Sequence, residues 1–339
     1  MVAQIDSRYL RTSPGKSFDR LLSYALFEGR PLTTRGRWIN PLVFANAGLI
    51  KRYAVATRPE APVFIIGTGR SGTTVLGVVL SLHPHIGFLN EPKALWHAAF
   101  PGEDLTGSYT DEPALYRLEE RHATDDVVRS MRRLYGAYSF AVGARRTLDK
   151  YPELIFRVPF VRRIFPDARF LFLLRDGADT CRSIESWSQR HGSTEAGEAV
   201  DWWGRNDRKW RCMVEQLVRT DPQLGGLTEV IRRFTRQTDR AAVEWVLSMR
   251  EGLRLAAELP DKVMPVRYEE LVRAPVATLR HIFEFCQLPT DPLTLNYASR
   301  TLRPAGAESR PLEIDPVIAP EFDAMRTQLG YAGSGSPHR

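Results

Sequence analysis

Cysteine is scarce in this chain of 339 residues. Its three cysteines, Cys181, Cys212 and Cys286, lie far apart in the sequence. An odd number of widely spaced thiols supplies neither a disulfide framework nor the paired spacing of a structural zinc site. The pattern excludes a small disulfide-stapled fold and indicates buried free thiols in a reducing cytoplasm.

Long apolar runs are also absent. No stretch reaches the roughly 18 consecutive apolar residues that a membrane-spanning helix needs. Residues 1–16 carry charges with no apolar segment after them, so we expect no secretory signal. The composition, 43% apolar and 26% charged, is that of a globular protein, and the length suits one large α/β domain or two smaller ones.

Lysine is rare, since only six of the 47 basic residues are lysine. The formal net charge is +7, and residues 1–60 hold ten basic against four acidic residues. This segment is either a solvated basic extension or is attracted to an anionic surface such as membrane lipid or an acidic acceptor. Nucleic acid is disfavoured as a partner, because no binding motif accompanies the charge.

Among the features that are present, residues 62–91 organise the chain. The apolar run 63–66 predicts a buried parallel strand, and the loop GTGRSGTT follows at residues 67–74. Residues 75–82 continue as an apolar helix that ends before Pro84. A strand, a glycine-rich loop and a helix in this order bring backbone N–H groups and a helix N-terminus around a phosphate.

The loop departs from the nucleotide P-loop, G-x-x-x-x-G-K-[ST], at one position. Gly67 and Gly72 have the required spacing, but Thr73 replaces the lysine and the cation has moved to Arg70. An ATPase without that lysine loses its main cation for the β- and γ-phosphates, whereas a loop holding one phosphate with a different group attached does not need it. An ordinary strand-to-helix turn is the alternative interpretation.

A second strand also ends at a basic residue. The apolar run 169–174 leads into Arg175-Asp176-Gly177, and a helix is predicted over 178–189. Arg175 and Ser183 are eight residues apart, so the strand end and the helix bring them toward one phosphate. Asp176 is placed like the magnesium-binding aspartate of an ATPase, but the neighbouring Arg175 disfavours a cation site.

The remaining pattern predicts an α/β protein, a P-loop-like three-layer fold with a central parallel sheet flanked by helices. We predict helices over 17–28, 127–138, 202–218, 240–259 and 269–286, a polar break at 149–152, an edge strand over 263–268 and a basic loop over 296–312 that closes over an anion. The expected organisation is a basic N-terminal extension over 1–60 packed on the main domain, that domain over 61–325, and a partly disordered tail over 326–339.

Two further groups of side chains are candidates for chemical sites. Glu91 follows a short apolar run, where a carboxylate facing a phosphate loop can act as a general base. Spacing alone favours an exposed loop glutamate. His83, His85 and His97 lie close together, but no cysteine or paired carboxylates complete a metal set, so no metal site is expected.

Three segments together resemble a known family. The loop with Arg70, the segment FLLRDGADTCRSI with Ser183, and the segment VRYEEL resemble the sulfotransferases that use 3′-phosphoadenosine-5′-phosphosulfate (PAPS). The likeness is nearest to the tyrosylprotein and bacterial branch, and it covers roughly residues 61–315.

The resemblance implies roles for particular residues. Glu91 matches the family's catalytic base, and Lys150 resembles the lysine that contacts the leaving group, although Asp149 and Tyr151 depart from the family's N-K-D-P segment. The implied donor site has Arg70, Ser71, Gly72, Thr73 and Thr74 on the 5′-phosphosulfate, Arg175 and Ser183 on the 3′-phosphate, Tyr268 and Ser299 along the nucleotide, and Arg310 at the position of a closing lysine.

The resemblance therefore implies a PAPS-dependent sulfotransferase that needs no metal and releases 3′,5′-adenosine bisphosphate (PAP). A sugar, a glycolipid or another small metabolite is favoured as acceptor over a tyrosine, with residues 95–145 and 185–240 shaping its pocket. Trp187, Trp202 and Trp203 either stack on that acceptor or belong to the core. The expected location is cytoplasmic, either free in solution or peripheral at a membrane surface through the basic N-terminal segment. A P-loop kinase or ATPase is the main alternative, and a non-enzymatic nucleotide-binding protein is the second.

Overall fold

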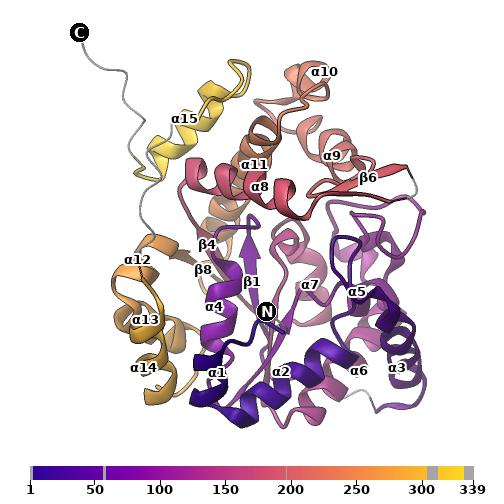
Figure 1. The fold of residues 1–339 in the computed structure, drawn as a ribbon, viewed down its shortest axis with the longest axis vertical. Helices are drawn as coiled ribbons and strands as arrows, with labels where there is room; N and C mark the ends of the chain where they lie inside the picture. Colours follow the sequence, from indigo (N-terminus) through magenta and orange to yellow (C-terminus); the bar gives the residue numbers. More distant parts are fainter. Residues whose placement is uncertain (1–2, 56–58, 196, 304–311, 332–339) are drawn as a thin grey trace.

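The computed structural model describes residues 3–55, 59–195, 197–303 and 312–331. Its centre is a sheet of five parallel strands in the order β2-β3-β1-β4-β8 (Figure 1). The strands are β1 (Val63–Gly67), β2 (Ile86–Asn90), β3 (Arg146–Lys150), β4 (Arg169–Leu174) and β8 (Val263–Arg267). This arrangement confirms the predicted α/β class, and β8 is the edge strand that Pro265 indicates.

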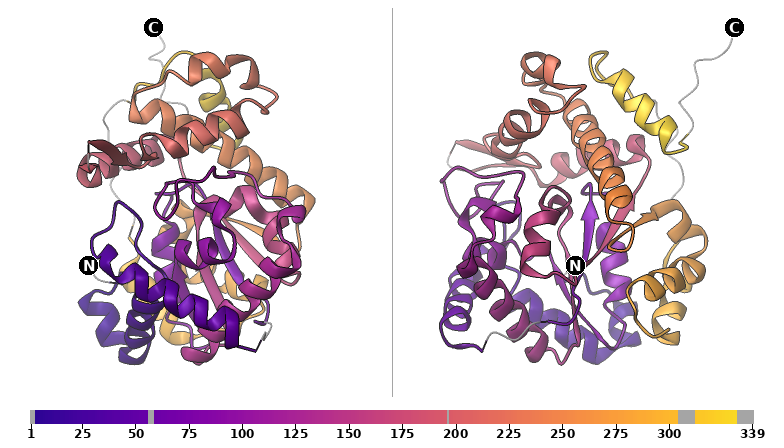
Figure 2. Two further views of the ribbon diagram at one scale, coloured as in Figure 1. Left: turned by 90° about the vertical axis from the view of Figure 1, so that its right-hand side faces the viewer. Right: turned by 180° about the vertical axis from the view of Figure 1, so that it is seen from behind.

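Helices cover both faces of the sheet. Strand β1 divides its side chains between them: Phe64 and Ile66 enter one apolar core, whereas Val63 and Ile65 enter the other. The first core is closed by α5 (Lys93–Ala99), α6 (Asp125–Ala141), α7 (Val158–Ile164), α8 (Gly177–His191), α11 (Gln237–Glu258) and α15 (Ala319–Gln328). The second is closed by α1 (Ser7–Thr12), α4 (Thr73–Leu80), α12 (Tyr268–Arg273), α13 (Pro275–Phe285) and α14 (Pro292–Thr301). Seen from behind, α11 runs across the sheet (Figure 2).

The N-terminal segment packs against this core through α2 (Pro14–Leu26) and α3 (Asn40–Tyr53). Tyr9 and Ser81 share a hydrogen bond of 2.7 Å between their hydroxyls. Arg20 is buried, and its guanidinium donates to the carbonyl oxygen of Phe88 on β2. Because Arg20 and Arg30 are both buried, neither adds to a basic surface that would attract lipid. The domain boundary at residue 60 stays a prediction.

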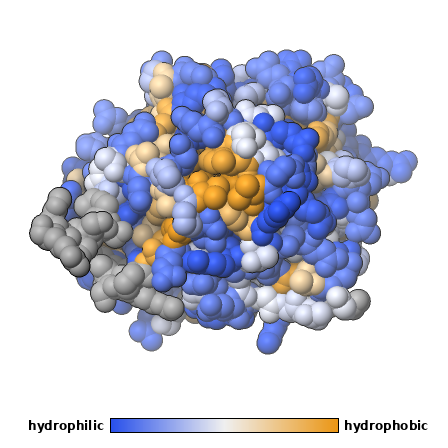
Figure 3. All heavy atoms as spheres, turned by 90° about the horizontal axis from the view of Figure 1, so that it is seen from above, coloured by the Kyte–Doolittle hydropathy of each residue, from blue (hydrophilic) through white to orange (hydrophobic). Residues whose placement is uncertain are grey.

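At the end of the molecule opposite α2 and α3, which is the top of Figure 1, the helices include α9 (Arg208–Met213) and α10 (Thr228–Ile231). Seen from that end the surface is mainly hydrophilic, with hydrophobic side chains gathered near the middle (Figure 3). Among the described residues, none of the helices combines the length and apolar character that crossing a bilayer requires.

Strand β3 corrects the polar break expected at 149–152. Asp149 and Lys150 end an interior strand between β2 and β1, whose sequence RTLDK has a single apolar residue, and Tyr151 and Pro152 follow it outside the sheet. Each buried polar side chain has a partner: Arg146 donates to the carbonyl oxygen of Cys286, Thr147 shares a hydrogen bond with Ser139, and Asp149 accepts from Trp96. Hydrogen bonds inside the fold therefore compensate for the missing apolar pattern.

Three other predicted boundaries were wrong. A small antiparallel sheet of β5 (Ser193–Glu195), β6 (Glu198–Asp201) and β7 (Gly204–Arg205) occupies the start of the helix expected over 202–218. The helix expected over 269–286 is two helices, because Pro275 begins α13 and ends α12. The first part of the basic loop expected over 296–312 is helical, since α14 extends to Thr301.

Candidate active site

A cavity of about 310 Å³ lies at the carboxyl ends of β1, β2 and β3. The phosphate loop contributes Gly69, Arg70, Thr73 and Thr74 to its lining. Asn90 ends β2 and Glu91 follows it, and Lys150 ends β3. Ligands of open parallel sheets bind at this edge, so the sheet itself brings the predicted loop, base and lysine together.

The phosphate loop has the backbone that its glycines permit. Gly67, Arg70 and Gly72 have φ angles of +137°, +68° and +92°. A Cβ atom at Gly72 would lie 2.3 Å from Cδ2 of Tyr268, so this position accepts only glycine without displacing that ring. Beneath the loop, the hydroxyls of Thr68 and Ser71 are buried and have no partner among the described residues. Because buried hydroxyls normally have hydrogen-bond partners, these two are suited to donate to an oxyanion bound in the loop.

The predicted 3′-phosphate residues lie against this loop. Arg70 donates from Nε to Oγ of Ser183 at 3.2 Å, and Arg175 donates from Nη1 to the carbonyl oxygen of Arg70 at 3.1 Å. The guanidinium of Arg175 lies 4.7 Å from the ring centroid of Tyr268. Burial and the nearby charge of Arg190 lower the pKa of Arg70. An anion bound here would relieve that repulsion between cations.

Asp176 is engaged in a way that does not fit a magnesium ligand. It is the N-cap of α8 and accepts hydrogen bonds from the backbone N–H groups of Ala178 and Asp179, at 2.8 and 3.2 Å. Its second oxygen is 3.0 Å from Nη2 of Arg326. The residue that imitates an ATPase aspartate in sequence is therefore a helix cap.

Glu91 and Lys150 are ion-paired with each other. The backbone N–H of Glu91 donates to the carbonyl oxygen of Lys150 at 2.8 Å, and Glu91 has a φ of +51°. Its side chain keeps 34% exposure, which leaves the carboxylate accessible from the cavity. Burial raises the pKa of Glu91, but Lys150 and Lys93 outweigh that effect and hold the pKa below its usual value.

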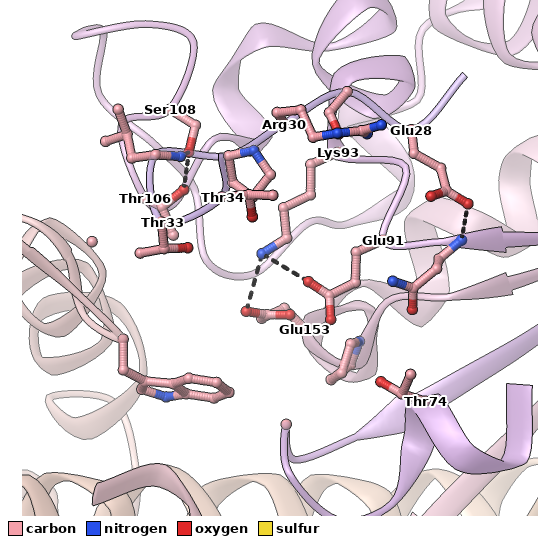
Figure 4. Close-up of a pocket in the computed structure, with 18 of the residues that line it drawn as sticks. Glu28, Arg30, Thr33, Thr34, Thr74, Glu91, Lys93, Thr106, Ser108 and Glu153 are labelled. Atoms are coloured by element: carbon pink, nitrogen blue, oxygen red, sulfur yellow. Dashed lines mark hydrogen bonds and ion pairs between the residues drawn. The ribbon is translucent and has the colours of Figure 1, made fainter. Parts of the chain in front are cut away.

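A row of alternating charges continues from Glu91 away from the loop. Lys93 lies between two carboxylates, 3.5 Å from Glu91 and 3.8 Å from Glu153 (Figure 4). Lys209 lies 3.2 Å from Glu153 and 2.6 Å from Glu244. The cavity floor therefore carries cations that are each paired with a carboxylate.

Other predicted residues have different positions. Thr73 and Thr74 line the cavity, whereas Ser299 is on α14, donates to the carbonyl oxygen of Asn296 at 2.9 Å, and lines a separate depression beside Arg303. The structure does not bring Ser299 to Arg70 or Glu91, and its role stays a prediction. Arg310 lies outside the described residues. Among the described residues, no cluster of three or more potential metal ligands is found.

Sequence reasoning missed several lining residues. Lys93, Glu153, Lys209 and the segment 28–34 all reach the cavity. The rarity of lysine was a usable signal, because three of only six lysines in the chain line this one cavity. Nothing in the sequence signalled the N-terminal segment, which reaches the cavity only through the fold.

Comparisons with known proteins identify the family of this chain. A family model described as "Sulfotransferase family" matches residues 62–224 and 210–292. A protein-tyrosine sulfotransferase of Drosophila melanogaster is 25% identical over 274 residues, which cover 79% of this chain and 47% of that protein. Protein-tyrosine sulfotransferase 1 of Danio rerio is 23% identical over 274 residues, covering 79% of this chain and 65% of that protein.

The chain thus spans between about half and two thirds of these two relatives. Among solved structures, the sulfotransferase domain from the curacin biosynthetic pathway aligns with a TM-score of 0.46 and 19% identity, covering 81% of this chain and 99% of that domain.

Proposed function

The chain belongs to the sulfotransferase family, and from this premise we propose that it transfers a sulfuryl group from PAPS to an acceptor hydroxyl and releases PAP. One observation carries the proposal. Thr73 holds the position of the ATP-loop lysine, and the cation of the phosphate loop is Arg70, which contacts Ser183 and Arg175. A site built this way suits a donor with phosphates at both ends of its ribose.

The donor would be held at two places. The backbone of the loop, Thr73, Thr74 and the N-terminus of α4 would bind the 5′-phosphosulfate. Arg175 and Ser183 would bind the 3′-phosphate, which distinguishes PAPS from ATP. Tyr268 supports both places, because its ring contacts Gly72 and Arg175.

Glu91 would act as the general base. It takes the proton of the acceptor hydroxyl, whose oxygen attacks sulfur and forms the new S–O bond while the bond from sulfur to the bridging oxygen of PAPS breaks. The electron pair stays on that oxygen, where Arg70 and Lys150 stabilise the developing charge. Lys150 would exchange Glu91 for the leaving group, which frees the carboxylate for the proton.

The acceptor is proposed to be a sugar, a glycolipid or another small hydroxyl compound. The curated relatives are named for protein tyrosine, so tyrosine is the competing acceptor. The lining of the cavity favours the small compound, because half-buried indoles, threonines and paired charges surround a volume of only about 310 Å³. A cytoplasmic location is part of this proposal.

Replacement of the base tests the proposal. We expect Glu91→Gln to lower kcat by about 10²- to 10⁴-fold, because the amide cannot take the proton. PAP affinity, measured by calorimetry, should stay close to that of the wild type. Glu258→Gln, which removes a surface carboxylate at the end of α11, is the matched control. Turnover that survives in Glu91→Gln would remove Glu91 from the mechanism.

A further inference from the structure

We propose that the N-terminal residues 24–34 form the acceptor-selecting wall of this cavity, and that the wall fits a neutral, hydroxyl-rich ring such as a monosaccharide. Tyr24 and all the residues from Glu28 to Thr34 line the cavity, although they precede the region that the family model matches. The inference rests on the proposed function and narrows its acceptor. It also assigns acceptor choice to a part of the chain outside the matched domain.

The wall is fixed in place by its neighbours. The backbone N–H of Arg30 donates to Oδ1 of Asn40 at 2.7 Å, and Nδ2 of Asn40 donates back to the carbonyl oxygen of Arg30 at 2.8 Å. A Cβ atom at Gly29, where φ is +71°, would lie 2.4 Å from Cβ of Ala94. A wall held this closely is preorganised, so substrate binding would not carry the entropic cost of ordering it.

The wall is also joined to the strand that carries the base. Glu28 is buried, pairs with Arg20 at 2.6 Å, and accepts the backbone N–H of Asn90 at 2.8 Å. Figure 4 shows this contact beside Glu91. The side chain of Asn90 lines the cavity, and its Oδ1 is buried with no partner among the described residues. A substrate molecule against the wall would therefore lie beside Glu91. It would also lie next to Asn90, whose Oδ1 is not used in a hydrogen bond to any described residue.

Hydroxyls form the rim of the wall. Thr33 and Thr34 face the cavity together with Thr106 and Ser108 (Figure 4). The hydroxyls of Thr106 and Ser108 are 2.8 Å apart, and Ser108 also accepts the backbone N–H of Leu32 at 3.2 Å. Within the described part of the chain, the hydroxyls of Thr33 and Thr34 make no hydrogen bond. Groups that both donate and accept suit the hydroxyls of a sugar.

Two indoles contribute the apolar part of the lining. Trp202 lies against the phosphate loop, because a Cβ atom at Gly69 would come within 2.4 Å of its ring. Its Nε1 donates to Glu244 at 2.8 Å, which holds the ring in place, and Trp187 contacts it at a centroid distance of 5.2 Å. An aromatic surface facing a hydroxyl rim is the lining that a sugar ring, with apolar faces and polar edges, requires.

The charges of the floor favour a neutral acceptor. Lys93 is paired with Glu91 and Glu153, and Lys209 with Glu153 and Glu244. Arg30, buried in the wall, donates to the carbonyl oxygens of Gly29 and Tyr24. An acidic peptide would have to displace these partners to reach Lys93 or Lys209, and the displaced carboxylates would stay buried and unpaired.

The test removes only the rim hydroxyls. The double variant Thr33→Val/Thr34→Val keeps the shape of the wall, and Thr278→Val on α13, outside the cavity lining, is the control. The acceptor probes are a set of methyl glycosides and an acidic tyrosine peptide, and PAP affinity is measured separately. We expect the wild type to sulfate a glycoside and the double variant to raise its KM about tenfold, with kcat and PAP affinity unchanged, because two hydrogen bonds are lost from binding.

Other results would overturn the inference in distinct ways. If the wild type sulfates the peptide and none of the glycosides, the acceptor is not a neutral ring. The same conclusion follows if the wild type binds PAP but sulfates no glycoside. An unchanged KM in the double variant would remove the wall from acceptor choice. Failure of the wild type to bind PAP would instead count against the proposed function, because the rim takes no part in donor binding.

Discussion

At the scale of single residues, the ion pair between Glu91 and Lys150 decides how the site would work. The depressed pKa of Glu91 keeps its carboxylate ionised at neutral pH, but a carboxylate bound to a lysine is a weak base. A donor that draws Lys150 to its bridging oxygen removes the closest positive partner of Glu91. The basicity of Glu91 would then rise only when PAPS is bound, which links catalysis to an occupied donor site.

Arg175 carries a prediction at the same scale. We expect Arg175→Ala to weaken PAP binding by about 10- to 100-fold, because a charge-assisted hydrogen bond to the 3′-phosphate contributes roughly 1.5–3 kcal/mol. Binding of 5′-AMP, which lacks that phosphate, should change little. Calorimetry with both nucleotides measures the difference, and Arg129→Ala on the exposed face of α6 is the control. Equal losses for both nucleotides would mean that Arg175 supports the fold of the loop and does not read the 3′-phosphate.

At the scale of elements, the phosphate loop owes its shape to contacts that glycine alone allows. Gly72 has a positive φ and lies under the ring of Tyr268, whereas Gly143 has a φ of +59° with nothing within 4 Å of an added Cβ. At both positions an added side chain would be strained by the positive φ. Only at Gly72 would it also collide with Tyr268. The two positions therefore form a matched pair for separating the two effects.

We expect Gly143→Ala to lower the free energy of unfolding by about 1 kcal/mol, the ordinary cost of a side chain at positive φ, and to leave PAP affinity unchanged. Gly72→Ala should cost more stability and lower PAP affinity at least about tenfold, because the methyl group displaces Tyr268 from the loop. Urea unfolding and calorimetry measure the two quantities. Equal behaviour of the two variants would show that the contact with Tyr268 has no part in donor binding.

The elements differ in how far the sequence predicts them. Strands β1 and β4 are continuous apolar runs, so their pattern and the loops after them are visible in the sequence. Strand β3 is not visible, because Asp149 and Lys150 are buried by virtue of partners at distant positions. For Glu91 the residues alone favoured an exposed loop, and the family resemblance supplied the role. The wall over 24–34 is placed at the cavity by contacts with distant residues, among them Asn90, Ala94 and Ser108, which no local pattern encodes.

At the scale of the whole molecule, a buried carboxyl beneath the site links stability to pH. Burial raises the pKa of Asp149 to about 7, from 3.8 in an unfolded chain, against the hydrogen bonds from Tyr135 and Trp96. Between these two values the folded protein binds more protons than the unfolded chain. The stabilisation from this group is therefore complete below about pH 3.8 and is lost as pH rises toward 7.

In the Asp149→Asn variant, we expect the free energy of unfolding to fall less steeply with pH than in the wild type, by about 1 kcal/mol per pH unit between roughly pH 5 and 7. The reason is that asparagine accepts the same hydrogen bonds and does not titrate. Urea unfolding at several pH values measures the slope. Asp126→Asn, on an exposed turn of α6, should keep the wild-type slope. Parallel curves for Asp149→Asn and the wild type would place the pKa of Asp149 at an ordinary value.

The central claim is that the molecule is built around a donor with a 3′-phosphate. It is tested most directly by calorimetric titration of the wild-type protein with PAP, run beside ATP with magnesium. The account predicts tight binding of PAP and weak binding of ATP. The reason is that Arg175 and Ser183 would bind a 3′-phosphate, whereas no P-loop lysine is present to hold the β- and γ-phosphates. Tight binding of magnesium ATP with weak binding of PAP would contradict it, and the roles of Glu91 and Lys150 would be withdrawn.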